Sequence, residues 1–360
     1  MDKKQTLKMI ADISNANGAP GFEDEVVAQI RAYGKTLGRI EEDSLRNIYI
    51  YRNENKGNTL KVQLDAHSDE VAFMIQAIRP DGNMQILPLG GWVTSNEPAH
   101  KVWVRNALGE YIPGIIASKP PHFMTEEERR APLEFENITV DVGATSDKEA
   151  REEFHIRIGE PVVPDVTFTY DEKHDIMIGK SFDCRLGCAA MLSTLEELKG
   201  QELQVDIVGA CCSQEEVGTR GSQVTCRTIE PDIAIVFEGC PADDTGVFAE
   251  RYKVQTAIKK GPMLRHIDKR MITNPRYQRY ALELAEKLNI PVQEAVRLGG
   301  STNGANIHLS GQGVPTIVIG IPVRYAHTHY GISAYADYEN SVKLAVEILK
   351  RLDRKLIQSF

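Results

Sequence analysis

Two adjacent glutamates follow an apolar segment in the middle of the chain. Residues 205–212 form a mostly apolar run that predicts a buried strand, and Ser213-Gln214-Glu215-Glu216-Val217-Gly218 comes directly after it. In an open α/β sheet, ligands bind at the edge formed by the carboxyl ends of the strands. We therefore expect Glu215 to transfer protons and Glu216 to hold a metal ion.

Other side chains of metal-binding type stand at similar places. His67 ends a predicted strand at residues 60–67, and Asp69 follows two residues later, where its carboxylate can accept the second ring N–H of the histidine. Each such position has a structural explanation when considered alone, but one chain rarely places six of them at strand ends by chance. The six are His67, Asp183, Glu215, Glu216, Glu238 and His327.

The residue types in this set indicate the chemistry. Imidazole and carboxylate ligands without thiolate suit zinc, cobalt or manganese. Five ligands, one of them a bridging carboxylate, are what a site with two metal ions requires. The sixth residue is then free to act as a base on the attacking water.

The composition excludes several classes of function. The chain has 360 residues, of which 42% are hydrophobic, and a net charge of −9. The acidic balance argues against nucleic acid as the main partner, because a phosphate backbone needs a basic surface. No apolar segment approaches the ~20 residues of a membrane span, and no signal-like segment opens the chain. We expect a cytoplasmic protein that does not enter membranes.

The six cysteines lie in one part of the chain, and their spacing matches neither a zinc ribbon nor a redox pair. We interpret them as small buried side chains in a reducing compartment. They are Cys184, Cys188, Cys211, Cys212, Cys226 and Cys240.

The hydrophobic pattern divides the chain into an α/β part, residues 1–72 and 165–360, and an inserted part, residues 73–164. Helical periodicity predicts helices in the α/β part at residues 6–15, 22–37, 189–199, 275–288 and 338–359. Short apolar runs there predict strands at residues 47–51, 60–67, 205–212, 232–237 and 314–321. The sequence thus predicts an α/β domain that resumes after the insert.

The insert has a different pattern, with short β-type runs separated by glycine and proline. These runs predict a small barrel or sandwich. A short helix is expected at residues 145–154, with Ser146 as its N-cap and Glu149 three residues later. The charged run at residues 126–130 is interpreted as a solvated surface loop.

Several motifs together resemble the M42 family of metallo-aminopeptidases, and the resemblance covers essentially the whole chain. The most specific elements are the Gln-Glu-Glu-Val-Gly sequence and an Arg-Tyr-X-His sequence. The matching segments are Asn17-Gly18-Ala19-Pro20-Gly21-Phe22-Glu23-Asp24-Glu25, Ala66-His67-Ser68-Asp69-Glu70-Val71-Ala72-Phe73-Met74, Gly114-Ile115-Ile116-Ala117-Ser118-Lys119-Pro120-Pro121-His122, residues 213–218 and Pro322-Val323-Arg324-Tyr325-Ala326-His327.

This resemblance implies a role for each candidate residue. Asp183 would bridge two divalent metal ions, with zinc or cobalt expected first and manganese also suitable. Glu216 and His327 would complete one ion, and His67 and Glu238 would complete the other. Glu215 would be the general base and then the general acid, and Asp69 would orient His67.

The resemblance also implies a fold and an assembly. The fold would be a mixed-sheet α/β/α metallopeptidase domain carrying a small all-β, barrel-like insert. The insert would serve dimerisation, and dimers of this family often assemble further into dodecamers. The substrates would be short peptides that lose their N-terminal residue.

The chain departs from the family pattern at three positions. Cys184 stands where a second aspartate is usual, Glu238 where Asp is frequent, and Asn303 where Asp is usual. We expect the loop containing Asn303 to line the substrate pocket. His329 is a rival to His327, which we prefer because it follows Arg324-Tyr325.

Other functions use the same residues differently. A deacylase would apply the site to N-acyl amino acids, and an inactive assembly would bind metal for structural reasons. A glycosidase would need two carboxylates flanking a sugar bond instead of a metal-bound cluster. Arg220 and Arg324 could favour an acidic substrate side chain or form structural ion pairs, so the sequence leaves the residue preference open.

Overall fold

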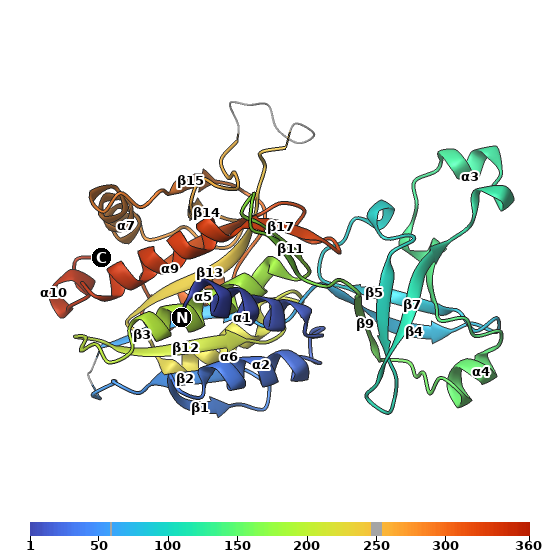
Figure 1. Ribbon diagram of the computed structural model, residues 1–360, viewed down its shortest axis with the longest axis horizontal. Coiled ribbons are helices and arrows are strands. Elements are labelled where there is room, and N and C mark those ends of the chain that lie inside the picture. Colours follow the sequence, from blue (N-terminus) through green and yellow to red (C-terminus); the bar gives the residue numbers. More distant parts are fainter. Residues whose placement is uncertain (58–59, 246–253) are drawn as a thin grey trace. The chain divides into compact units, whose positions relative to one another are not determined.

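The computed structural model describes residues 1–57, 60–245 and 254–360 (Figure 1). The chain contacts divide it into two compact units. Unit 1 comprises residues 1–69, 167–326 and 330–360, and unit 2 comprises residues 70–166 and 327–329. Each unit has a hydrophobic core of its own. The division into domains at residues 72/73 and 164/165 stays a prediction.

The main sheet of unit 1 is mixed, as predicted. Its central strands β12, β3, β13 and β16 run parallel, whereas β2 pairs antiparallel with β12 and β14 with β16. The strand order is β1 (Gly38–Glu42), β2 (Ile48–Arg52), β12 (Asp206–Cys212), β3 (Lys61–His67), β13 (Ile233–Pro241), β16 (Thr316–Val323), β14 (Met263–Ile267) and β15 (Gln293–Val296).

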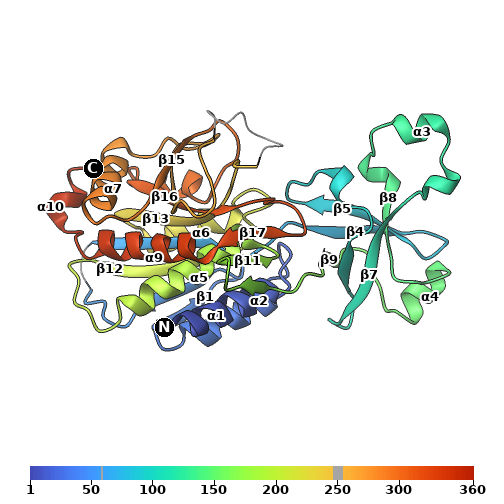
Figure 2. The same cartoon turned by 45° about the horizontal axis from the view of Figure 1, so that its top comes forward.

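Helices cover both faces of this sheet (Figures 1 and 2). One face packs against α1 (Lys3–Asn15), α2 (Asp24–Gly34), α5 (Phe182–Glu197), α7 (Pro275–Lys287) and α9 (Tyr335–Leu349). The other face packs against α6 (Arg220–Ile229) and α8 (Gly304–Ile307).

Strand β12 shows why its sequence is apolar without alternation. Ile207 and Cys211 point into the first core, whereas Val208 and Cys212 belong to a cluster on the opposite face. A strand buried on both faces needs apolar side chains at every position. The mostly apolar run before Glu215 therefore places the glutamates at the end of a central strand.

Unit 2 contains a closed antiparallel barrel, which confirms the predicted barrel-like insert. The barrel order is β4 (Ala72–Ile78), β5 (Met84–Leu89), β8 (Ile138–Asp141), β7 (Tyr111–Ser118), β6 (Lys101–Arg105) and β9 (Pro161–Pro164). Its interior is apolar, with Phe73, Ile86, Val104 and Val140 fully or almost fully buried. A closed barrel leaves no unpaired strand edge among these strands.

Some predicted elements have different bounds. Helix α5 begins at Phe182 and not at residue 189, and Asp183 lies near its start, where the backbone of Asp183 and Cys184 is non-helical. Glu238 lies inside β13 and not after it. The expected helix at residues 338–359 is divided into α9 and α10 (Arg354–Ile357).

Unit 2 holds two short α-helices. The charged run is a short exposed helix, α3 (Glu126–Arg130), because Thr125 provides a capping box, so the prediction of a loop was wrong. Helix α4 (Asp147–Glu152) has the predicted cap, in which the Ser146 side chain accepts the Glu149 N–H.

Three further short strands form a separate sheet in unit 1. They are β10 (Thr169–Asp171), β11 (Ile176–Gly179) and β17 (Gly331–Ala334). Across the described ranges, no helix is both long and apolar enough to span a bilayer.

Candidate metal centre

The parallel strands of unit 1 bring the predicted residues to one edge of the sheet. His67 is the last residue of β3 and pairs in register with Cys212, the last residue of β12. Glu238 lies two residues beyond the last register pair of β13 with β3. Ligand-type side chains far apart in the sequence thus converge at the carboxyl ends of neighbouring strands, as the topology requires.

His67 is buried among three carboxylates. Its Nε2 lies 3.1 Å from an Asp183 oxygen and 3.4 Å from a Glu238 oxygen. Its Nδ1 lies 3.2 Å from the Asp69 carbonyl oxygen and 3.4 Å from the Asp69 carboxylate. A proton on Nδ1 would hydrogen-bond to Asp69 and leave the Nε2 lone pair directed toward Asp183 and Glu238.

Burial of His67 together with Asp69, Asp183 and Glu238 is electrostatically unfavourable without a cation. Burial by itself lowers the pKa of His67, but the hydrogen bonds with Asp183, Asp69 and Glu238 raise it well above its ordinary value. Burial, followed by the charge of Asp183, raises the pKa of Glu238 to about 7. Several carboxylates at one buried place repel one another, and bound divalent cations commonly compensate this negative charge.

The geometry of these donors fits a metal ion. One potential ligand atom from each of His67, Asp183, Cys184 and Glu238 lies within 4.8 Å of the others. Imidazole and carboxylate oxygens are the donors that zinc and cobalt accept. Glu216 and Asp183 also place ligand atoms within 4.8 Å of each other, which extends the acidic group to a second possible ion.

Glu215 and Glu216 lie on a turn, residues 213–218, that we call the acidic turn. The Asp69 carboxylate accepts the Glu215 N–H at 2.8 Å with one oxygen and the Glu216 N–H at 3.0 Å with the other. Asp69 is fully buried. Its carboxylate therefore contacts both His67 and the acidic turn, and the second contact was not predicted.

Glu215 is a half-buried residue, and both its burial and its charged neighbours affect the pKa of its carboxyl group. Burial raises the pKa of Glu215 well above its ordinary value. The charge of His67 opposes this shift, and those of Glu238, Glu216 and Asp69 add to it. Bound cations would counter the same negative charges and favour the ionised form.

His327 and His329 both belong to unit 2, and their surroundings there differ. The His327 Nδ1 lies 2.9 Å from the Gly91 carbonyl oxygen, which leaves Nε2 as the atom able to bind a metal. His329 is buried and stacks on His100, with the ring centroids 4.1 Å apart. The preference for His327 as a ligand stays a prediction.

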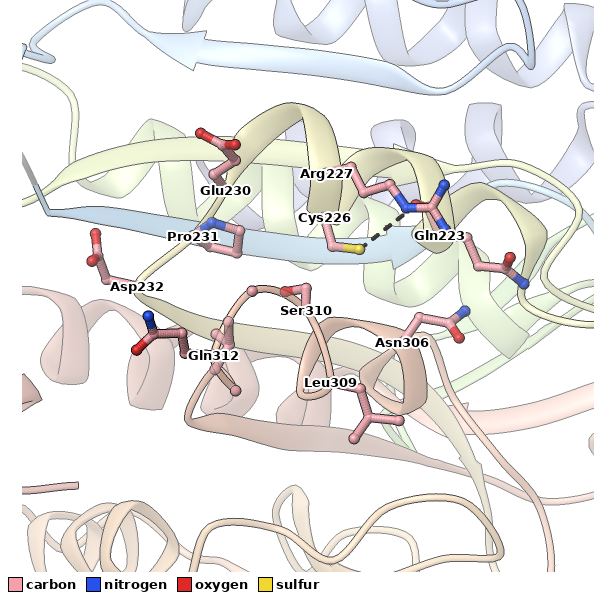
Figure 3. A pocket seen from close by; sticks show the side chains of 13 residues that line it. Gln223, Cys226, Arg227, Glu230, Pro231, Asp232, Asn306, Leu309, Ser310 and Gln312 are labelled. Atoms are coloured by element: carbon pink, nitrogen blue, oxygen red, sulfur yellow. Dashed lines mark hydrogen bonds between the residues drawn. The ribbon is translucent and has the colours of Figure 1, made fainter.

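A cavity of about 840 Å³ lies elsewhere in unit 1, along α6 and residues 306–314 (Figure 3). Polar side chains such as Gln223, Arg227 and Asn306 line it. It contains none of the predicted ligands and neither Glu215 nor Asp69. This cavity is therefore separate from the carboxylate group around His67.

Comparison with known proteins identifies the family. Residues 47–344 match the family described as M42 glutamyl aminopeptidase. The chain belongs to the M42 family. It is 30% identical to the lysyl aminopeptidase of Pyrococcus furiosus over 97% of each chain. It is 29% identical to the glutamyl aminopeptidase of Lactococcus lactis over 91% of this chain and 90% of the relative.

A solved structure supports the same assignment. The TET aminopeptidase from a marine sediment archaeon of the Thaumarchaeota superimposes with a TM-score of 0.95 at 32% identity, covering 99% of each chain. Membership of the M42 family, with aminopeptidases among its relatives, makes this protein a peptidase hydrolase. The family also implies divalent metal ions, for which the group around His67 offers ligands.

The structure gives each departure from the M42 pattern a local setting. The Cys184 thiol donates to the Phe237 carbonyl at 3.1 Å, and burial raises its pKa well above the ordinary value. Asn303 is buried and donates to the Asp65 carboxylate at 2.8 Å. An aspartate at position 303 would instead face that buried carboxylate, so Asn303 avoids a repulsive pair.

Two arginines considered for substrate recognition have partners in the fold. Arg324 donates to both carboxylate oxygens of Asp244, at 2.8 and 2.6 Å. Arg220 is exposed and donates to the Gln214 side chain at 3.3 Å. The bidentate pair gives Arg324 a charge-assisted partner within the fold.

Two polar residues that contact the acidic turn were not singled out from the sequence. Glu23 accepts the Gln214 N–H, and Asn47 accepts the Ser213 N–H. Glu23 lies in the segment 17–25 that carried part of the family resemblance. This position in a matched motif was the one available signal, because the contact spans 191 positions of sequence.

Proposed function

We propose that this protein is an aminopeptidase that uses two divalent metal ions to remove N-terminal residues from short peptides. Zinc or cobalt is the preferred ion, and manganese is compatible with the same donors. The observation that carries this proposal is the burial of His67 among Asp69, Asp183 and Glu238 beside the acidic turn. Such a group combines a metal-type donor set with a glutamate, Glu215, that can transfer protons.

The proposed ligand arrangement uses five residues. Asp183 would contribute to both ions, His67 and Glu238 would hold one of them, and Glu216 and His327 would hold the other. The convergence of His67, Asp183 and Glu238 within unit 1 supports the first set. The Nδ1 contact of His327 with the Gly91 carbonyl supports Nε2 ligation in the second set.

When bound, two such ions would supply positive charge for polarising the scissile carbonyl and for lowering the pKa of the attacking water. Glu215 accepts a proton from that water and delivers it to the leaving amine. Asp69 holds the backbone of Glu215 and Glu216, so the base keeps its position during the transfer. The substrate's free α-amino group binds at the acidic site, which restricts cleavage to the first peptide bond.

We leave the preferred N-terminal residue unassigned. One relative is named glutamyl and another lysyl aminopeptidase, so family membership does not fix this preference. Arg324 is paired with Asp244 and gives no support to an acidic preference.

The protein is proposed to act in the cytoplasm as a homo-oligomer, a dimer or a dodecamer, with no nucleic-acid or membrane partner. Large apolar side chains are exposed on unit 2 and support an interface between copies of the chain. They are Leu87, Val93, Leu108, Ile115, Phe123 and Ile158. Size-exclusion chromatography with light scattering measures the assembly, and a monomer at working concentration would contradict this part of the proposal.

A Glu215→Gln variant tests the catalytic claim. We expect kcat on aminoacyl chromogenic substrates to fall by roughly 10²- to 10⁴-fold, with metal content and assembly unchanged. Glu202→Gln, at an exposed position, is the matched control and should behave like the wild type. Wild-type turnover by metal-loaded Glu215→Gln would refute the role of Glu215. Hydrolysis of N-acyl amino acids alone would indicate a deacylase.

A further inference from the structure

Four successive backbone N–H groups of the acidic turn donate to side chains from other parts of unit 1. Asn47 Oδ1 accepts the N–H of Ser213 at 2.9 Å. Glu23 Oε1 accepts the N–H of Gln214 at 3.2 Å. The two Asp69 carboxylate oxygens accept the N–H groups of the next two residues, Glu215 and Glu216.

The backbone of the acidic turn needs such support. Gln214 has a φ of +51°, in the left-handed region that is unfavourable for non-glycine residues. This conformation persists only where the surroundings determine it. Successive N–H groups in such a turn also form a concavity that attracts anionic oxygens. The carboxylates of Glu23 and Asp69 occupy this place.

Glu23 is not explained by its own helix. It is the N-cap residue of α2, yet its side chain accepts no capping hydrogen bond from that helix. The side chain is fully buried, and Oε1 accepts the Gly21 N–H at 2.8 Å in addition to that of Gln214. Within the described ranges, the buried Oε2 has no hydrogen-bond partner.

Burial of this carboxyl group is unfavourable on its own. Burial, followed by the charge of Asp69, raises the pKa of Glu23 to about 7. An apolar residue would avoid this cost, because an unpaired buried polar atom destabilises the fold. Of the two hydrogen bonds that Glu23 Oε1 accepts, one comes from its own segment and the other from the acidic turn. We therefore look to the acidic turn for the role of this buried carboxylate.

We propose that Glu23 is a positioning residue for Glu215, acting by fixing the Gln214 backbone through its Oε1 acceptor. Glu23 and Asp69 together fix three consecutive N–H groups, and the direction of the Glu215 side chain follows from that backbone. The described hydrogen bonds of the Glu23 side chain go to the Gly21 and Gln214 N–H groups and to none of the five proposed ligands. This inference rests on the proposed role of Glu215 as the base.

Two substitutions at position 23 separate the acceptor from the charge. Glu23→Ala removes the acceptor and should lower kcat by about 10- to 100-fold, because a misplacement of ~1 Å can cost about 100-fold. We expect KM to change less than about threefold and the metal content to stay at the wild-type level. Glu23→Gln keeps a carbonyl acceptor of the same length and should restore kcat to within about threefold of the wild type.

A second readout follows the backbone without depending on activity. Hydrogen–deuterium exchange by mass spectrometry should show faster exchange of the peptide spanning residues 213–218 in Glu23→Ala but not in Glu23→Gln. The matched control is Glu25→Ala, which removes an exposed carboxylate from the same segment. Glu25 accepts the Asn17 N–H at 2.8 Å and, within the described ranges, forms no hydrogen bond or ion pair with the acidic turn. It should leave kcat and exchange unchanged.

The outcomes distinguish this inference from the proposed function. A kcat for Glu23→Ala within threefold of the wild type, or a Glu23→Gln variant as impaired as Glu23→Ala, would overturn the role of Glu23. Glu215→Gln is measured in parallel on the same substrates. Should Glu215→Gln keep wild-type kcat, the proposed function itself fails. Should it lose activity while Glu23→Ala does not, only the inference fails.

Discussion

Two buried histidines, His67 in unit 1 and His329 in unit 2, occupy opposite kinds of surroundings. Their exposed fractions are 2% and 1%, so burial does not distinguish them. His67 lies within 3.4 Å of carboxylate oxygens from Asp69, Asp183 and Glu238. Such an excess of buried negative charge around one imidazole favours the binding of a cation, because buried charges need compensation.

His329 lies among aromatic rings. Its ring stacks on His100 at 4.1 Å and lies 5.4 Å from Trp92, with Glu97 3.5 Å from Nδ1. The described contacts of His329 are thus two aromatic rings and one carboxylate, whereas three carboxylates surround His67. Converging carboxylates therefore favour a metal-binding role for a buried histidine such as His67, whereas burial and nearby rings alone do not.

Removal of His67 should have the largest effect. His67→Ala deletes a proposed ligand, so we expect kcat/KM to fall by more than about 100-fold, beyond the usual effect of changing a residue that only supports a ligand. The control is His174→Ala, which removes an exposed histidine paired with Asp171 at 2.6 Å. Activity of His67→Ala within tenfold of the control would show that the carboxylate surroundings do not mark a catalytic metal site.

The Asp69→Asn variant tests the contribution of one carboxylate beside His67. Asparagine offers one carbonyl oxygen where Asp69 uses two to accept the Glu215 and Glu216 N–H groups. We expect kcat/KM to fall by about 10- to 100-fold. Steady-state kinetics at fixed metal concentration measures the loss. A variant indistinguishable from wild type would mean that Asp69 serves packing alone.

The Glu97→Gln variant tests the surroundings of His329 through the free energy of unfolding. Burial raises the pKa of Glu97 from 4.5 to about 8, so the folded state binds more protons than the unfolded state between these pH values. Stability contributed by this group is present below about pH 4.5 and is lost as the pH rises to about 8. Glu97→Gln should therefore stabilise the protein at pH 8 by at least about 1 kcal/mol.

Thermal unfolding at pH 5 and pH 8 measures the effect of Glu97→Gln. The gain should be larger at pH 8, and Glu136→Gln, an exposed substitution in the same unit, should show no such difference. Equal effects at both pH values would show that Glu97 is not a buried carboxyl group with a raised pKa.

His329→Phe should have the smallest effect on activity. Phenylalanine keeps the stacking on His100 and loses the polar contact with Glu97. We expect kcat/KM within about threefold of the wild type, because His329 is not among the five proposed ligands and phenylalanine preserves an aromatic ring at this position. A loss of more than 100-fold with intact folding would make His329, and not His327, the ligand.

The hydrophobic pattern predicted an α/β domain and a small barrel or sandwich, because their strands are distinct in pattern, whereas the mixed sheet was implied by the family resemblance. The central strands β3, β12 and β13 are long apolar runs, whereas β1, β14 and β15 at the sheet margins are short and were missed. Local periodicity carries no information on which strands become neighbours. Their pairing was inferred only from the general rule that strand ends in an α/β sheet share one edge.

The candidate ligands were also named from the sequence, because His and Glu at strand ends are conspicuous. Their supporting contacts were not. Glu23 and Asn47 are 191 and 166 positions away from their partners in the acidic turn, and no sequence spacing encodes such pairs. Asp69 was assigned to His67 from proximity in sequence, whereas its contact with Glu215 and Glu216 depends on the parallel pairing of β3 with β12.

Metal stoichiometry tests the central claim most directly. Chelator-treated wild-type protein is titrated with Zn²⁺ in a calorimeter, and the bound metal is confirmed by elemental analysis. Two ions per chain are predicted, with at most one retained by His67→Ala. Fewer than one ion per wild-type chain, or equal binding by His67→Ala, would contradict the account of this site as a binuclear metal centre.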